Sequence, residues 1–129
     1  MKNLTAIFAF LFAAVFASAA APKITDISQA DLQAAIASKS VVLLDVNGSD
    51  SYKESHIPGA IDFIAHKRDI ANLLPADKHA LVVAYCGNEQ CSAYRAAAHA
   101  ALALGYTNVK HFAPGIDGWI KSGAHTDKG

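Results

Sequence analysis

Two apolar runs constrain the fold of this chain more than any other feature. Val41–Val46 and Ala80–Tyr85 are rich in valine, leucine and alanine, and apart from Asp45 they contain no charged residue. They lack the alternation of polar and apolar residues that marks a strand with one face in water. Runs of this kind are typical of strands buried on both faces, as in a parallel sheet that helices cover on each side. We therefore expect both segments to lie in the centre of such a sheet.

The segments around these runs predict helices in alternation with strands. Ser28 and Asp31 form the pattern of a capping box, and apolar residues follow at helical spacing, which predicts a helix over 29–38. The other predicted elements are an extended segment over 22–25, a loop or short helix over 47–55, a brief strand over 61–63, a helix over 66–73, an alanine-rich helix over 92–104 ended by Gly105, a strand over 109–112 and a helix over 115–121. This alternation predicts an α/β domain with a mainly parallel sheet.

The first 21 residues are typical of a secretory signal peptide. Lys2 precedes an apolar stretch over 4–16, and small residues follow. We predict a signal peptide over 1–19, with cleavage after Ala19 or as late as Ala21, and one domain over 22–125. The apolar stretch is shorter than the roughly 20 residues of a spanning helix, which disfavours the alternative of a retained membrane anchor. The mature protein is thus predicted to be periplasmic or secreted, free of the membrane, in a compartment where cysteines can pair.

Charge and histidine spacing argue against two classes of function. The chain has 11 basic and 11 acidic residues without a basic run or stripe, so nucleic acid is not an expected partner. The 6 histidines include no pair at ligand spacing on one predicted element, and the sequence has no Cys-x-x-Cys pattern. No metal site is therefore predicted.

The clearest chemical pattern follows the second apolar run. Cys86 stands at the end of that predicted strand, and a helix is predicted to begin at Ser92. Ligands of open α/β sheets bind beyond the carboxyl ends of strands. The amides of a loop that curls before a helix N-terminus form a cradle for anions. A cysteine in such a cradle is expected to have a lowered pKa and to act as a nucleophile without a separate base.

Three groups of residues, in order along the chain, resemble the signatures of the rhodanese family. They are Leu43–Val46 with Tyr52 and His56–Ala60, then Tyr85–Ser92, then Leu104–Tyr106 with Pro114–Trp119. The resemblance spans roughly residues 25–123 and implies a three-layer rhodanese-like α/β domain, with a central mainly parallel sheet flanked by helices. The loop from Cys86 to Cys91 has the length of the sulfurtransferase branch, whereas the related phosphatases carry a longer loop.

The resemblance implies that the protein is a sulfurtransferase. Cys86 would accept a sulfane sulfur as a persulfide from thiosulfate, polysulfide or a persulfide donor, and would pass it to a thiol, to cyanide or to an acceptor protein. No cofactor is implied. Asp45 would be a structural hydrogen-bonding partner beside the loop, in preference to a general base, and Ser92 would cap the helix. The residues that would form the substrate cradle are Gly87, Asn88, Glu89, Gln90, Cys91 and Ser92.

The chain departs from the family pattern within and beside this loop. The loop contains no Arg or Lys and carries Glu89, which would repel the thiosulfate dianion; Arg95 would offset this only if its side chain points back to the loop. Asn47 and Cys91 both stand at positions where many members have Arg. Cys91 either fills space at the helix start or forms a disulfide with Cys86. The alternative function is therefore a non-catalytic or redox-sensing binding module that uses a Cys86/Cys91 thiol–disulfide switch.

Overall fold

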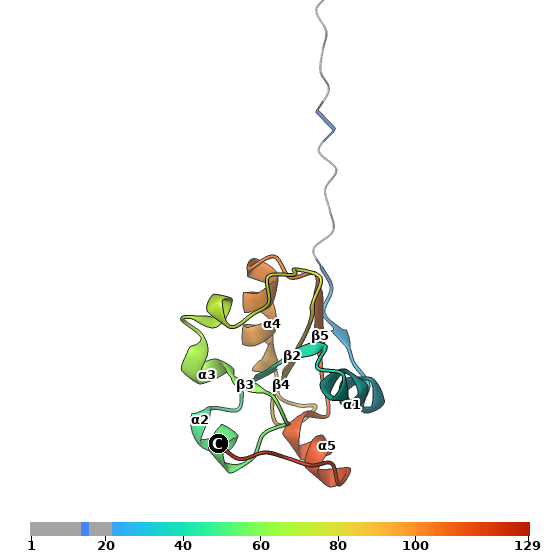
Figure 1. Cartoon of the computed structure of the whole chain (residues 1–129), viewed down its shortest axis with the longest axis vertical. Helices are drawn as coiled ribbons and strands as arrows, with labels where there is room; N and C mark the ends of the chain where they lie inside the picture. Colours follow the sequence, from blue (N-terminus) through green and yellow to red (C-terminus); the bar gives the residue numbers. More distant parts are fainter. Residues whose placement is uncertain (1–13, 16–21) are drawn as a thin grey trace, which may run out of the picture.

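A five-stranded parallel sheet forms the centre of the computed structural model, which describes Ala14–Val15 and residues 22–129 (Figure 1). In their order across the sheet, the strands are β1 (Thr25–Asp26), β5 (Asn108–His111), β4 (Leu81–Tyr85), β2 (Val41–Asp45) and β3 (Ile61–Asp62). All four pairings between neighbours are parallel. The two apolar runs are the adjacent strands β2 and β4, and the prediction of a mainly parallel sheet is confirmed. The predicted signal peptide lies outside the described residues, apart from Ala14 and Val15.

Helices cover both faces of the sheet and complete three layers. They are α1 (Gln29–Ala37), α2 (Ser49–Glu54), α3 (Phe63–His66), the 3-10 helix η1 (Ile70–Asn72), α4 (Tyr94–Ala103) and α5 (Gly115–Lys121). In Figure 1, α3 and α4 lie on one side of the sheet, and α1 and α5 lie on the other. Val82 and Ala84 of β4 belong to the core beneath α4, whereas Val83 and Tyr85 belong to the core that contains Trp119. Because β4 is buried on both faces, its sequence shows no polar alternation.

Local capping explains why several predicted boundaries are confirmed. The side-chain oxygen of Ser28 accepts a 3.1 Å hydrogen bond from the Asp31 amide at the start of α1. At the end of α4, Gly105 adopts a φ of 93°, a left-handed conformation that glycine reaches at low cost. The last helix, α5, has the bounds that the sequence predicts.

The prediction of a single helix over 66–73 is wrong. Asp62 starts α3 directly after β3, because its carboxylate accepts a 3.1 Å hydrogen bond from the Ala65 amide and caps the helix there. After α3 ends, the chain forms η1, which places Ile70 in the core at 5% exposure. Two short helical pieces thus replace the expected helix, so that Phe63 and Ile70 can both be buried.

The C-terminal segment packs against the region around α2. His56 and Asp127 exchange two backbone hydrogen bonds of 2.9 Å, and the Gly129 amide donates to the Lys53 carbonyl at 3.1 Å. The ring of His56 stacks on Tyr52 with the ring centres 3.8 Å apart, and its Nδ1 lies 2.8 Å from the Tyr52 carbonyl oxygen. These contacts give His56 a structural role in joining the C-terminal segment to α2.

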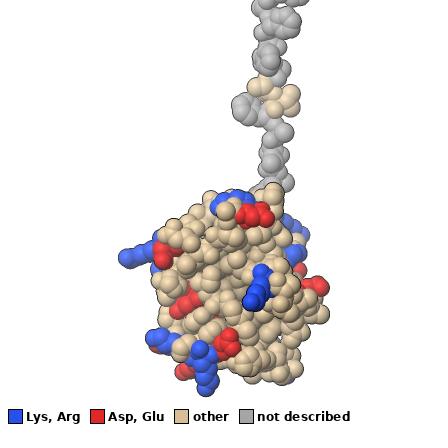
Figure 2. All heavy atoms as spheres, viewed as in Figure 1, with Lys and Arg blue, Asp and Glu red and all other residues tan. Residues whose placement is uncertain are grey.

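The visible face of the domain carries charges of both signs. Figure 2 shows Lys and Arg interspersed with Asp and Glu, without a large patch of one sign on that face. Among the residues that the structure describes, no helix has the length and apolar character needed to cross a membrane.

Candidate active site

The loop between β4 and α4 is the candidate active site. It begins at Cys86, directly after a central strand, and ends where α4 starts at Tyr94. The expectation that Ser92 caps this helix is wrong, because the cap residue is Ala93 and no side chain caps the helix end. The backbone carbonyl of Ser92 instead accepts from the Arg95 amide at 3.1 Å. The helix therefore begins two residues later than predicted, and a tight turn completes the loop.

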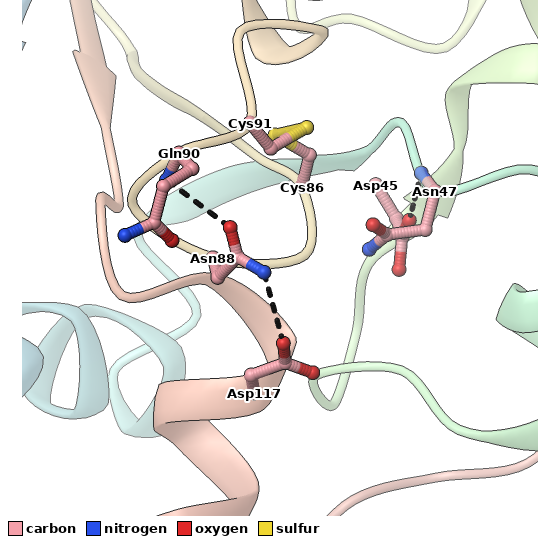
Figure 3. The surroundings of a disulfide bond; sticks show 7 residues. All are labelled: Asp45, Asn47, Cys86, Asn88, Gln90, Cys91 and Asp117. Carbon is pink, nitrogen blue, oxygen red and sulfur yellow. Dashed lines mark hydrogen bonds between the residues drawn. A yellow bond between two sulfur atoms is a disulfide. The ribbon is translucent and has the colours of Figure 1, made fainter.

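Cys86 and Cys91 form a disulfide that closes this loop (Figure 3). Their Cα atoms lie 6.3 Å apart, within the range that disulfides span. Cys86 is 1% exposed and packs in the core beneath α4, whereas Cys91 is half-buried at the edge of that core. Of the two cysteines, Cys91 is thus the more exposed residue.

Asn88 organises the inside of the loop. Its side-chain Oδ1 accepts from the Gln90 amide at 3.1 Å, and its carbonyl oxygen accepts from the Cys91 amide at 3.1 Å. Its Nδ2 donates to the Asp117 carboxylate at 3.2 Å, as Figure 3 shows. Two amides of the expected cradle are therefore already occupied within the loop. In the described part of the chain, the amides of the other four cradle residues have no protein acceptor, and these residues are Gly87, Asn88, Glu89 and Ser92.

The first turn of α5 fixes the start of the loop from below. The Ile116 amide donates to the Cys86 carbonyl, and the Asp117 amide donates to the Gly87 carbonyl, both at 2.9 Å. Gly115, with a φ of 62°, lies so close that a Cβ there would come within 2.6 Å of the Gly87 backbone. Backbone bonds therefore hold the carbonyl groups of Cys86 and Gly87 in place.

Asp45 lies at the end of β2 and acts as a structural acceptor. Its Oδ2 accepts from the Tyr85 hydroxyl at 2.6 Å, and its Oδ1 accepts from the Asn47 amide at 2.7 Å. The same Tyr85 hydroxyl accepts from the Ile57 amide at 3.1 Å. These bonds join Asp45 to the residue before Cys86, rather than to the loop itself. Burial raises the pKa of Asp45 despite the hydrogen bond from Tyr85, and burial together with the Asp45 charge raises the pKa of Tyr85.

The raised pKa of Asp45 gives a testable pH dependence. The folded state holds this proton to higher pH than the unfolded state does, so the contribution of Asp45 to stability falls as pH rises through its folded pKa. We expect the free energy of unfolding of wild type, relative to Asp45→Asn, to decrease from pH 4 towards pH 7, with a slope of up to about 1.4 kcal/mol per pH unit. Urea unfolding of both proteins across this range measures the difference. A difference that stays constant with pH would contradict the assignment.

The charges around the loop are mainly acidic. A hollow of about 420 Å³ lies beside the loop, and it is lined by Asn88, Glu89, Gln90, Pro114, Asp117, Gly118 and Lys121. The sequence analysis did not single out Asp117 and Lys121. Their spacing of four residues on α5 was the available signal, because it places them on one helix face.

Asn47, which stands where many members have Arg, lies beside the loop. Its Oδ1 would be 3.7 Å from a Cβ atom at Gly87. Asn47 therefore lies beside the loop, as expected for the position that Arg occupies in many members, but its side chain carries no positive charge.

Arg95 does not supply the missing loop cation through any contact in the described structure. Its guanidinium carbon lies 5.9 Å from the centre of the Tyr94 ring, and that ring stacks on His111 of β5. Burial lowers the pKa of His111, and the positive charge of Arg95 adds to this effect, against the attraction of Asp26.

The described residues contain no group of three or more His, Cys, Asp or Glu side chains placed to hold a metal ion. The reactive groups that the described chain places at the loop are its two sulfur atoms and the backbone amides around them. Cys86 and Cys91 are joined at the carboxyl end of the sheet, where ligands of open α/β folds bind.

Comparisons with known proteins agree with this architecture. The family model described as Rhodanese-like domain matches residues 28–122, which include the whole loop. None of the curated proteins matches the chain. Among solved structures, the BH2092 protein from Bacillus halodurans is 26% identical with a TM-score of 0.63, over 81% of this chain and 77% of that one.

Two further solved structures that resemble this chain are of larger proteins, of which this chain covers 20% and 28%. Thiosulfate sulfurtransferase from Pseudomonas aeruginosa is 23% identical with a TM-score of 0.66, over 85% of this chain and 20% of that one. An EanB variant, in complex with ergothioneine covalently linked to a persulfide cysteine, is 20% identical with a TM-score of 0.65, over 82% of this chain and 28% of that one. These two likenesses show the fold alone. The family model matches most of the described domain, and the chain therefore belongs to the rhodanese-like domain family.

Proposed function

We propose that the protein is a sulfurtransferase that carries a sulfane sulfur as a persulfide on Cys86. The observation that carries this proposal is the place of Cys86, which follows a central strand of a rhodanese-like domain and precedes the N-terminal end of α4. Sulfurtransferases share this fold, as the likeness to thiosulfate sulfurtransferase illustrates. The signal-like N-terminus supports a periplasmic or secreted location, where the mature protein would meet its donors and acceptors.

The proposed transfer has two steps, both of which begin from the reduced loop. First, the Cys86 thiolate attacks the sulfane sulfur of a donor, a bond forms between the two sulfur atoms, and the remainder of the donor leaves with the electron pair of its broken bond. Then an acceptor thiolate or cyanide attacks the terminal sulfur, and Cys86 leaves as a thiolate. The free amides of Gly87, Asn88 and Glu89 are the donors available to stabilise these anions.

The acidic surroundings of the loop favour donors of low negative charge. Glu89 and Asp117 line the adjoining hollow, and Lys121 is the one basic residue in that lining. A thiosulfate dianion would be repelled more than the singly charged methanethiosulfonate, and salt would screen the difference. Thiosulfate is therefore proposed as a poor donor for this loop.

Intact mass spectrometry of reduced Cys91→Ser tests the proposal. This variant keeps Cys86 and cannot form the loop disulfide, so a persulfide on Cys86 should accumulate. After mixing with methanethiosulfonate, polysulfide or thiosulfate, we expect a gain of one sulfur atom that a reductant removes. Cys86→Ser, which keeps Cys91 instead, is the matched control and should not gain sulfur.

The choice of donor adds a second readout to the same experiment. Methanethiosulfonate should load Cys91→Ser about tenfold faster than thiosulfate at low ionic strength, and added salt should reduce this ratio. If no donor adds sulfur to reduced Cys91→Ser, the sulfurtransferase proposal is wrong.

The disulfide favours a second candidate function, a redox-sensing binding module. A thiol–disulfide switch requires two cysteines that can form a disulfide, and Cys86 and Cys91 form one here. Neither cysteine of the described chain is a free thiol in this state. Under this reading, a partner would bind one redox state more tightly than the other, and Cys86→Ser would retain binding while losing the redox response. Sulfur loading of Cys91→Ser separates the two candidates, because a binding module has no need to accept sulfur.

A further inference from the structure

The second cysteine gives the loop a chemistry beyond simple sulfur transfer. We propose that Cys91 is a resolving cysteine, which discharges the persulfide on Cys86 as hydrosulfide and makes the domain a sulfide-releasing persulfide reductase. This inference rests on the proposed function, since it requires a persulfide on Cys86. It differs from that function in its product, because the sulfur leaves as sulfide rather than on an external acceptor.

The geometry places the two sulfur atoms within bonding reach while the loop stays closed. The disulfide coexists with the hydrogen bonds that brace the loop, from the Cys91 amide to the Asn88 carbonyl and from the Ile116 amide to the Cys86 carbonyl. Attack by Cys91 on Cys86 therefore needs no rearrangement of these braces. A reaction within one short loop also has the advantage of high effective concentration over any thiol from solution.

Burial makes Cys91 the better placed of the competing nucleophiles. Cys86 is 1% exposed and packs against the core beneath α4. An external thiol must approach its inner sulfur through that packing, whereas Cys91 already contacts it. Cys91 is therefore better placed than any thiol from solution to attack this inner sulfur, which is the attack that releases sulfide.

The discharge step balances within the loop. The Cys91 thiolate attacks Sγ of Cys86 in the persulfide, and its electron pair forms the Sγ–Sγ bond. The bond between Cys86 Sγ and the terminal sulfur breaks, and the terminal sulfur leaves with that electron pair and takes up the proton that the Cys91 thiol gave up, as hydrosulfide. The sulfane sulfur is thereby reduced, Cys91 is oxidised, and the product is the disulfide seen in the structure.

An external dithiol of a protein or a small molecule resets the loop. One of its thiolates attacks the half-buried Cys91 rather than the 1% exposed Cys86. Cys86 then leaves as a thiolate beside the amides of Gly87 and Asn88, which have no protein acceptor in the described chain. The second thiol of the reductant releases Cys91, and the loop is ready to accept sulfur again.

Single-turnover sulfide release from the full mature chain tests the inference. Reduced wild type and Cys91→Ser are freed of reductant and mixed with methanethiosulfonate, whose sulfinate product reports loading separately from sulfide. We expect wild type to release one equivalent of sulfide and to end as the disulfide without added sulfur. Cys91→Ser should release sulfinate, keep the sulfur, and produce sulfide at least tenfold more slowly. Cys91→Ala repeats the test with a side chain that cannot hydrogen-bond.

The outcomes separate this inference from the function on which it rests. If all three proteins load sulfur but wild type keeps it as long as the variants do, Cys91 is not a resolving cysteine, and the sulfurtransferase proposal stands. Equal sulfide release from wild type and variants also overturns the inference. If no protein releases sulfinate or gains sulfur, both proposals fall.

Discussion

Gly115→Ala is expected to destabilise the domain by about 3 kcal/mol or more and to displace the start of the active loop. The position has a φ of 62°, and a Cβ there would lie 2.6 Å from the Gly87 backbone and closer still to the Cys86 carbonyl oxygen. Backbone cannot give way as a flexible side chain can. Relief of the clash must therefore lengthen the bonds from the α5 amides to the carbonyls of Cys86 and Gly87. Sulfur loading of Cys86 should fall together with stability.

Gly123→Ala is the matched control for this prediction. Gly123 also has a positive φ, of 81°, but a Cβ there meets nothing within 4 Å. Both alanines carry the conformational cost of about 1 kcal/mol, and only the one at position 115 adds the collision. Urea unfolding measures the two losses. Equal losses of stability for the two variants would contradict the prediction, because they would mean that α5 can move away from the loop and relieve the collision at position 115 at little cost.

Tyr85→Phe is expected to lower the free energy of unfolding by about 3 kcal/mol. The fully buried Tyr85 hydroxyl donates to the Asp45 carboxylate at 2.6 Å and accepts from the Ile57 amide at 3.1 Å. Phenylalanine keeps the ring but removes the hydroxyl, so that the buried Asp45 carboxylate and the buried Ile57 amide each lose a hydrogen-bond partner. The loss exceeds that of an ordinary hydrogen bond because both remaining groups stay desolvated.

Tyr106→Phe serves as the comparison for the loss of one neutral bond. Its ring is 1% exposed, and its hydroxyl donates to the Pro75 carbonyl, which is half-buried. This change should cost about 1 kcal/mol. In the Asp45→Asn background, the Tyr85→Phe effect should shrink, because the buried charge is gone. A full-sized effect in that background would assign the loss to the Ile57 bond alone.

The sequence predicts the central elements well because their burial leaves a strong pattern. Val41–Asp45 and Leu81–Tyr85 are apolar on both faces, apart from Asp45, and such runs fit few positions other than the middle of a parallel sheet. Helix α1 is similarly evident from the capping residues Ser28 and Asp31. The two short helices that replace the expected helix over 66–73 were harder to predict, because the Asp62 cap and the burial of Ile70 depend on tertiary packing.

The candidate site was predictable in position but not in internal structure. The strand end, the loop length and the helix that follows place Cys86 where ligands bind in α/β folds. The sequence left open whether Cys91 pairs with Cys86, because a separation of five residues permits a disulfide without requiring one. The braces from α5 and the hollow with Lys121 are contacts between segments distant in sequence, and no local pattern encodes them.

Oxidative folding of this chain has a single intramolecular product. Cys86 and Cys91 are the only 2 cysteines in the sequence, so no wrong pairing exists within one molecule. Short loops close in about 10–100 ns, whereas β1 must find β5 across 85 positions of chain. The sulfur atoms can therefore meet long before the sheet is assembled. Correct pairing in this protein requires an oxidant and makes no demand on a disulfide isomerase.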